Sequence, residues 1–134
     1  MRKVIIVSGI SIILAIIAVI STILFINIYF PAIGTFSLED YKSEIEYFSS
    51  NNNVGDVNNA YTAIKKAKDL WIEKFYKVAN GKATNPLKGK IFKVEYDSKN
   101  ECWHIYGEFI RITTGAVPHA LIQSDGKVLA VWME

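Results

Sequence analysis

The side chains best suited to catalysis lie in the C-terminal half of the chain: Cys102, His104 and His119. A thiol acts as a nucleophile when a nearby base holds it as the thiolate, and His104 is the nearest base in the sequence. Residues two apart on a strand share one face, but their Cβ atoms lie beyond hydrogen-bond reach of each other. We therefore expect Cys102 to be a half-buried structural cysteine at the start of a strand. One thiol and two histidines also form a poor metal-binding set.

Three residues are candidates for contact with a protein partner: Tyr106, Arg111 and His119. Arg111 is the only arginine outside the N-terminus, and Ile110 and Ile112 flank it. Its fork-shaped guanidinium could anchor an interface, or it could be a solvated charge at a strand end. His119 lies near the start of a strand, where we expect it on the solvent face. The alternative role for His119 is a general base or a pH-sensitive contact.

The carboxylates give no support for paired acid–base catalysis. Asp97, Glu101 and Glu108 fall in or beside turns, where acids favour turn formation and solubility. The sequence contains no P-loop, no glycine-rich dinucleotide-binding turn, no serine elbow and no paired CxxC motif. We therefore predict no catalytic residues, no cofactor and no metal ion.

The strongest helical pattern in the sequence runs from residue 59 to residue 79. Apolar side chains recur there at spacings of three and four, with charged residues largely on the other face. The apolar stripe consists of Ala60, Ala63, Ile64, Ala67, Trp71, Phe75 and Val78. Asn58 is the predicted N-cap, and Asn80-Gly81 is the predicted left-handed stop.

After Pro86 the apolar period changes to two, which predicts β-strands. The strand segments are 92–96, 103–108, 120–123 and 128–132. Asp125-Gly126 joins the last two as a hairpin turn. We expect Trp71, Trp103 and Trp132 in the core. One main helix packed on a three- to four-stranded antiparallel sheet makes an α+β fold.

The first 30 residues differ in composition from the rest. The chain is 51% hydrophobic, and no charged side chain occurs between Lys3 and Glu39. Residues 4–30 form an apolar run of 27 residues, about 40 Å long as a helix, and a hydrocarbon core needs about 20 residues. A cleaved signal peptide has an apolar core of about 7–15 residues and a small-residue cleavage site. The run therefore favours an uncleaved signal anchor.

The charges beside the apolar run predict how the chain is oriented. Arg2 and Lys3 precede it, and Glu39 and Asp40 are the first charges after it. Basic residues stay on the cytoplasmic side of a membrane. We therefore expect a single-pass cell-membrane protein with residues 1–3 in the cytoplasm and the C-terminal domain outside.

Residues 31–56 form the predicted juxtamembrane segment and linker, and residues 57–134 form the predicted domain. Residues 37–48 show an amphipathic helical pattern, which would serve either as a stalk or as a segment docked on the domain. The polar stretch 49–56 is rich in turn-forming residues and is the best linker in the sequence.

The charge balance of the exposed part excludes one class of partner. Of the 15 basic residues two precede the apolar run, so residues 31–134 carry 13 basic and 13 acidic side chains and are net neutral. A nucleic-acid-binding surface needs an excess of cations to neutralise phosphates. We therefore expect a protein partner, with the lipid bilayer contacted through residues 4–30, and no nucleic acid.

Residues 59–132 resemble the small immunity proteins with a nuclear-transport-factor-2-like fold that are found beside bacterial polymorphic toxins. Three motifs follow the helix beginning at Ala60 in the family's order. Trp103-His104-Ile105-Tyr106-Gly107 resembles the family's W-x-V-x-G, and Gly115-Ala116-Val117-Pro118 resembles its GG-x-P with alanine at the second glycine. Asp125-Gly126-Lys127-Val128-Leu129 resembles its DGKVL ending. The resemblance covers about 75 of the 134 residues.

This resemblance implies a truncated cystatin- or NTF2-like domain that binds and neutralises a cognate toxin without catalysing a reaction. The order of anchor, alanine-rich helix, tryptophan strand and DGKVL hairpin is also similar to PepSY-like extracytoplasmic domains. These are associated with modulating peptidases or cell-wall machinery. An enzyme built on the same fold would need an acid or histidine in a pocket, and only His104 and His119 are available.

Overall fold

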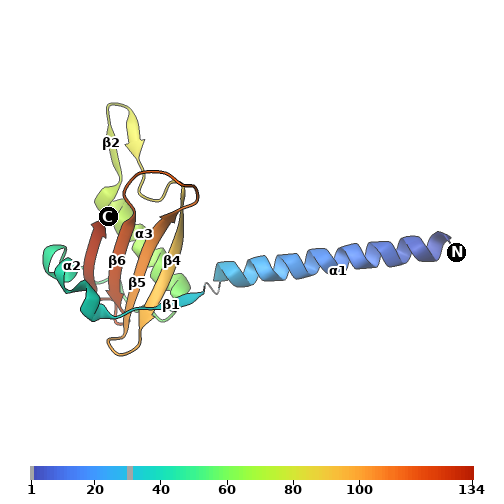
Figure 1. Ribbon diagram of the computed structural model, residues 1–134, viewed down its shortest axis with the longest axis horizontal. Helices are drawn as coiled ribbons and strands as arrows, with labels where there is room; N and C mark the ends of the chain where they lie inside the picture. Colours follow the sequence, from blue (N-terminus) through green and yellow to red (C-terminus); the bar gives the residue numbers. More distant parts are fainter. Residues whose placement is uncertain (1, 30–31) are drawn as a thin grey trace. The chain divides into compact units, whose positions relative to one another are not determined.

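The computed structural model describes residues 2–29 and 32–134, and the chain divides into two compact units, Met1–Pro31 and Ala32–Glu134 (Figure 1). Residues 32–56, expected to be a juxtamembrane segment and linker, thus belong to the same compact unit as residues 57–134. The second unit has a mixed α+β architecture, with a five-stranded sheet and a separate two-stranded sheet.

The first unit is a single helix, α1 (Arg2–Tyr29). Its central 18 residues, Ser8–Phe25, have a mean hydropathy of 2.6, and none of them is buried. By length and composition this helix can cross a membrane, although a signal sequence would meet the same two criteria. The predicted end of the apolar run at Phe30 lies outside the described residues.

The five-stranded sheet has the order β1-β4-β5-β6-β7. The four strands expected from the alternating pattern are present and antiparallel. They are β4 (Lys90–Asp97), β5 (Cys102–Phe109), β6 (Pro118–Gln123) and β7 (Val128–Met133). The unexpected fifth strand, β1 (Ile33–Thr35), pairs in parallel with Val94–Tyr96 of β4. It covers part of a sheet edge whose backbone groups would otherwise lack strand partners.

The main helix, α3 (Ala60–Phe75), begins one residue later and ends four residues earlier than predicted. Its N-cap is Asn59 rather than Asn58, because the Asn59 side chain accepts a hydrogen bond of 2.8 Å from the Thr62 backbone N–H. The helix stops before its last predicted turn because the next residues form a hairpin.

That hairpin consists of β2 (Lys77–Ala79) and β3 (Lys82–Thr84), and it projects beyond the main sheet (Figure 1). Asn80 and Gly81 have φ angles of 51° and 71°, which are the positive values that a two-residue hairpin turn requires. The prediction of these two residues as a helix stop was therefore wrong. Val78, assigned to the buried helical stripe, lies on β2 and is 65% exposed.

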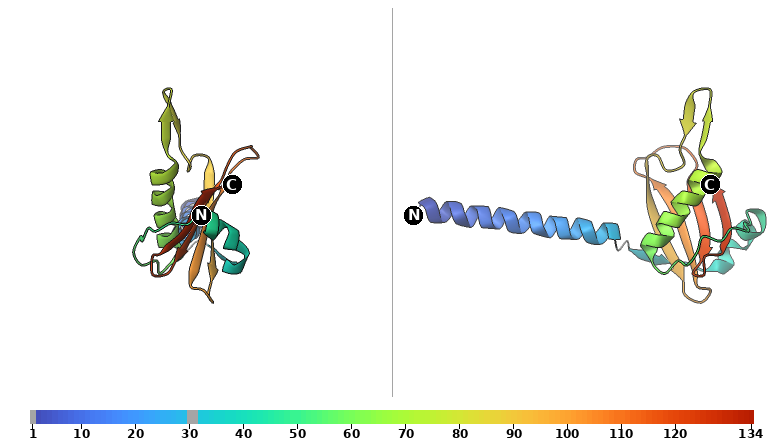
Figure 2. Two further views of the ribbon diagram at one scale, coloured as in Figure 1. Left: turned by 90° about the vertical axis from the view of Figure 1, so that its left-hand side faces the viewer. Right: turned by 180° about the vertical axis from the view of Figure 1, so that it is seen from behind.

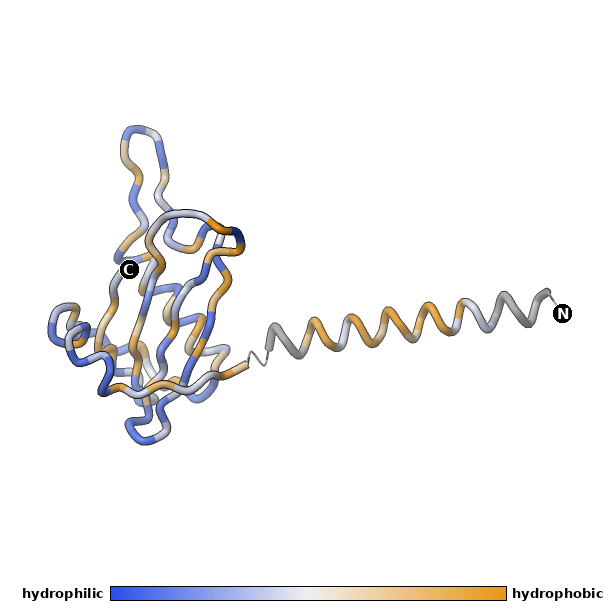
Figure 3. Tube along the Cα trace, viewed as in Figure 1, coloured by the Kyte–Doolittle hydropathy of each residue, from blue (hydrophilic) through white to orange (hydrophobic). Residues whose placement is uncertain are grey.

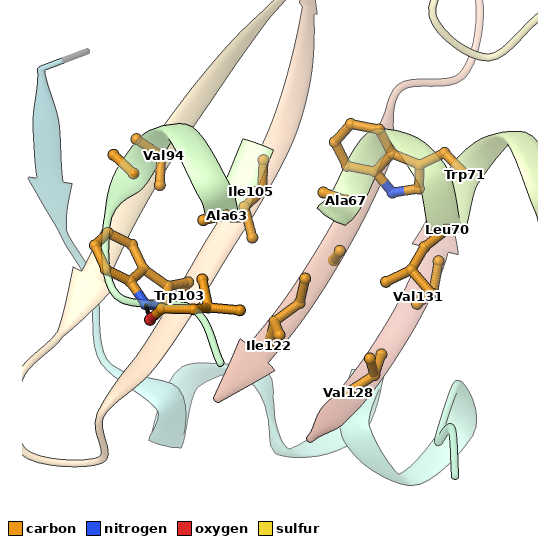
Figure 4. Close-up of a cluster of buried hydrophobic side chains, with 13 residues drawn as sticks. Ala63, Ala67, Leu70, Trp71, Val94, Trp103, Ile105, Ile122, Val128 and Val131 are labelled. Atoms are coloured by element: carbon orange, nitrogen blue, oxygen red, sulfur yellow. Dashed lines mark hydrogen bonds between the residues drawn. The ribbon is translucent and has the colours of Figure 1, made fainter. Parts of the chain in front are cut away.

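The main core lies between α3 and one face of the sheet (Figure 4). Trp71 of α3 and Trp103 of β5 are its largest side chains, as the sequence predicted. Each is 6% exposed or less, and each indole N–H is satisfied. Trp71 donates to the His119 carbonyl and Trp103 donates to the Val57 carbonyl, both at 3.1 Å.

The opposite face of the sheet is covered by the segment that follows β1 (Figure 2). The expected helix over 37–48 is split into the 3-10 helix η1 (Leu38–Tyr41) and the short helix α2 (Lys42–Tyr47). Of the two roles left open for it, docking on the domain is the observed one. Its apolar side chains pack against a second buried cluster, formed by Cys102, Leu121, Ala130 and Trp132.

A buried carboxylate holds the start of this covering segment in place. Asp97, 6% exposed at the end of β4, accepts hydrogen bonds from the Leu38 backbone N–H at 2.8 Å and from the Asn100 side chain at 2.7 Å. The backbone N–H groups of Lys99 and Asn100 also donate to it. Asn100 and then Leu38 hold the pKa of Asp97 below its ordinary value. One side chain thus organises the β4–β5 turn and fixes η1 to it.

The polar stretch 49–56 runs along the outer edge of β7. The backbone N–H of Val128 donates to Asn52, and the N–H of Val54 donates to Gly126 in the β6–β7 turn. A Cβ atom on Gly126 would lie 2.4 Å from the Gly55 carbonyl oxygen, so this turn and the 49–56 stretch fit together only with glycine.

We predict that Gly126→Ala costs about 3 kcal/mol or more in the free energy of unfolding, because it adds a backbone clash to the strain of a positive φ. The control is Gly81→Ala, where φ is also positive but the space is open, and we expect a loss of about 1 kcal/mol. Urea unfolding of the detergent-solubilised chain, followed by tryptophan fluorescence, measures both. Equal losses would contradict the close approach at Gly55.

Candidate functional site

Four titratable side chains form a continuous chain across the second face of the sheet. His104 Nδ1 on β5 lies 2.9 Å from Glu95 Oε2 on β4, and His104 Nε2 lies 3.0 Å from His119 Nδ1 on β6. His119 Nε2 in turn lies 3.3 Å from Glu134 Oε2. Strand register brings the groups together. Glu95 on β4 pairs directly with His104 on β5, and His119 on β6 is the diagonal neighbour of His104.

The hydrogen bonds define one consistent tautomer for the two histidines. If His104 donates from Nδ1 to the Glu95 carboxylate, its Nε2 is left as the acceptor for the Nδ1–H of His119. His119 then presents an unprotonated Nε2 toward Glu134. Among the described residues this nitrogen has no hydrogen-bond partner, because an unprotonated ring nitrogen and a carboxylate oxygen are both acceptors. The pair is thus a neutral dyad with a carboxylate at each end.

Aromatic rings enclose the dyad. Tyr41 of η1 lies 4.7 Å from His104 between ring centroids, and Trp132 of β7 stacks on His119 at 4.8 Å and 13°. Phe36 contacts His104 from the covering segment. As a result His104 is 2% exposed and His119 is 8% exposed. The expectation that His119 faces solvent was wrong, because residues 36–48 cover the sheet face on which it lies.

Burial determines the protonation of the dyad. Removal from water lowers the pKa of His104, against the opposing pull of the Glu95 carboxylate. Burial first, and then the neighbouring His104, lower the pKa of His119 to about 4. The hydrogen bond between the two neutral imidazoles can fix the tautomer of each ring. A fall in pH that protonates either ring would change this arrangement.

Cys102 does not join this group as a nucleophile. Its side chain is completely buried, rather than half-buried as expected, and burial raises its pKa to about 12. The thiol donates to the backbone carbonyl of its neighbour Trp103 at 3.7 Å. A thiol with such a pKa is protonated and inert at neutral pH. Among the described residues no three His, Cys, Asp or Glu side chains group closely enough to hold a metal ion.

Of the three candidate contact residues, the structure brings two together. Tyr106 pairs with His119 across β5 and β6, with their rings 5.8 Å apart, and it is the half-exposed outer member of the aromatic group. Arg111 lies instead in the loop between β5 and β6, where its neighbours Ile110 and Ile112 are 65% and 109% exposed. Figure 3 shows this loop as alternating hydrophobic and hydrophilic segments.

A surface depression of about 540 Å³ adjoins this loop. It is lined by Lys88, Gly89, Phe109, Ile110, Arg111 and Thr113. The backbone N–H of Ile110 donates to the Gly89 carbonyl at 3.1 Å, so the segment before β4 and the start of the loop form one surface. Arg111 is thus beside a hollow rather than at an isolated strand end.

Sequence reasoning missed Glu95 as the partner of His104. The signal was present in the alternation of the strands, which assigned both residues to the face opposite Trp103. What hid it was the register between β4 and β5, since the sequence pattern does not fix which residues lie opposite each other.

Comparisons of the chain with family models, with curated proteins and with solved structures found no match.

We predict that the domain loses stability on acidification through the buried dyad. Well above pH 6.5 His119 is neutral in both the folded and the unfolded chain. Below it the unfolded chain binds protons that the folded chain does not, so stability falls as the pH drops from about 6.5 toward 4, by about 3 kcal/mol for His119. His119→Gln should flatten this dependence in urea unfolding at pH 7 and pH 4.5. An unchanged slope in the variant would refute the assignment.

We also predict that Cys102 is unreactive in the folded protein, because it is buried and its pKa is about 12. A thiol reagent such as dithionitrobenzoate at pH 8 should label less than about a tenth of the chains until urea unfolds them. Rapid labelling of the native chain would show that Cys102 reaches solvent.

Proposed function

We propose that this chain is a membrane-anchored, non-enzymatic binding protein, an immunity protein that neutralises a cognate bacterial toxin by direct contact. The observation that carries the proposal is the β5–β6 loop, where Arg111 stands between two isoleucines that leave most of their surface in water. Arginine is one of the residue types that most often dominate the binding energy of a protein interface, and the exposed apolar side chains beside it add area that a partner can bury. The exposure of Ile110 and Ile112 to water does not stabilise the fold, whereas contact with a partner would bury them.

The state of the histidines favours binding over catalysis. A general base must reach the proton that it abstracts. Both ring nitrogens of His104 are engaged with Glu95 and His119, and the remaining Nε2 of His119 is buried beside the Glu134 carboxylate. The dyad therefore serves the packing of the second face, which leaves the exposed loop as the surface available to a partner.

The resemblance to nuclear-transport-factor-2-like immunity proteins points the same way. Its W-x-V-x-G-like motif forms most of β5, and its DGKVL-like ending forms the β6–β7 turn and the start of β7. The GG-x-P-like motif lies at the end of the β5–β6 loop, next to the exposed isoleucines. The motifs thus occupy the strands and loop that present the proposed contact.

We further propose that α1 is an uncleaved signal anchor with the C-terminal domain outside the cell. Arg2 and Lys3 are the only charges before the apolar segment, and they favour a cytoplasmic N-terminus. The partner would then be a toxin that acts on the cell envelope or is met there.

Co-expression tests the proposal. Cells that export a candidate toxin encoded beside this chain should survive with the full chain, and survival should fall with Arg111→Glu but not with the matched control Lys127→Glu, an exposed cation in the β6–β7 turn. Survival that never depends on the chain would refute the proposal. Equal rescue by residues 32–134 confined to the cytoplasm, at matched protein levels, would refute the topology.

A further inference from the structure

One end of the domain is cationic although the domain as a whole is neutral. Residues 74–93 contain six lysines and no acid, and residues 109–124 contain Arg111 and no acid. These two stretches supply the β2–β3 hairpin, the segment before β4 and the β5–β6 loop. With 13 basic and 13 acidic residues in 31–134, the acids are concentrated elsewhere. We call residues 76–91 and 109–116 the cationic end.

The fold gathers these segments at the same end of the sheet (Figures 1 and 2). Lys90 pairs with Phe109 across β4 and β5, and its ammonium lies 4.8 Å from the centre of the Phe109 ring. Lys88 and Arg111 line the same depression of about 540 Å³. Glu108 and Glu134 lie at the border of this surface, and Glu134 is turned toward His119.

The cationic end also exposes more apolar surface than its packing requires. Val78 of the hairpin and Ile91 of β4 are 65% and 44% exposed, in addition to the two isoleucines of the β5–β6 loop. Every residue of β2 and β3 is exposed, and a two-stranded hairpin alone is marginally stable in water. Exposed apolar side chains among charges of one sign are typical of an interface whose partner carries the opposite sign.

We infer that the cationic end binds an acidic protein surface, in which carboxylates surround an apolar side chain that enters the depression beside Arg111. This inference rests on the proposed function, because the partner is the proposed toxin. It specifies that the toxin contacts this chain through a small acidic patch. Arg111 would pair with a carboxylate through two parallel N–H donors, and Lys82 and Lys88 would supply more diffuse attraction.

The shape of the surface favours a protein partner over a lipid membrane. A bilayer presents a flat array of headgroups, and only Ile110 and Ile112 could insert into it. The depression lined by Gly89, Phe109 and Thr113 is instead concave, which suits one protruding side chain.

The test compares two triple variants with the same change in net charge. Lys82→Glu, Lys88→Glu and Arg111→Glu reverse the cationic end, whereas Lys65→Glu, Lys99→Glu and Lys127→Glu reverse exposed cations elsewhere. The full chain, in nanodiscs of neutral phosphatidylcholine, is titrated with the candidate toxin domain at low and at moderate salt. Ile112→Ser is a further variant that removes only apolar surface. Tryptophan fluorescence confirms that each variant is folded.

We expect the cationic-end variant to bind the toxin domain about tenfold or more weakly, the control within about twofold, and the natural complex to weaken as salt rises. Ile112→Ser should also weaken it. If the toxin domain binds all variants alike, the inference is wrong and the proposed function stands. If the natural chain does not bind it, the proposed function fails and the inference fails with it.

A further measurement distinguishes attraction to anionic lipid from attraction to an acidic protein surface. Phosphatidylglycerol vesicles are added to the same nanodiscs in place of the toxin domain. If reversal of the cationic end abolishes vesicle binding and leaves toxin binding unchanged, the surface recognises lipid and the inference is overturned.

Discussion

The sheet of this domain carries buried side chains on both faces, and the rest of the structure depends on covering both. The helix α3 covers one face, with Trp71 and Trp103 as its largest core residues. The other face, with Leu121 and Trp132, is covered by residues 36–48, and the Asp97 carboxylate ties this segment to the β4–β5 turn through the Leu38 N–H. A two-layer domain with one helix would leave that second face in water, at a cost that grows with its apolar area.

Covering the second face explains the state of its polar residues. His104 and His119 point toward the covering segment, so they must be neutral and hydrogen-bonded if they are to be buried there. Glu95 supplies the acceptor for His104, and its partial exposure lets the carboxylate keep contact with water. This arrangement engages both ring nitrogens of His104 and leaves Nε2 of His119 without a hydrogen-bond partner among the described residues. The lowered pKa values of both histidines predict a domain that is sensitive to acid. Both candidate histidines are therefore part of the packing of the second face.

The part of the surface that packing does not use is where we propose that a partner binds. The hairpin and the β5–β6 loop extend past the sheet, carry cations without acids, and expose isoleucines beside a hollow. Neither segment contributes a buried side chain to the two core clusters. The proposed partner of opposite charge would account for both the charge of this surface and its exposed apolar groups.

The sequence by itself determined the apolar helix, α3, the four antiparallel strands and the three core tryptophans, because periodicity and turn residues are local signals. It misplaced the helix end at Asn80-Gly81, since both a helix stop and a hairpin turn need positive φ. Only the tertiary structure decided that β1 joins the sheet, that residues 36–48 cover the second face, and that His119 is buried against His104. These contacts join residues far apart in the chain, and strand register, which no local pattern specifies, decides which of them meet.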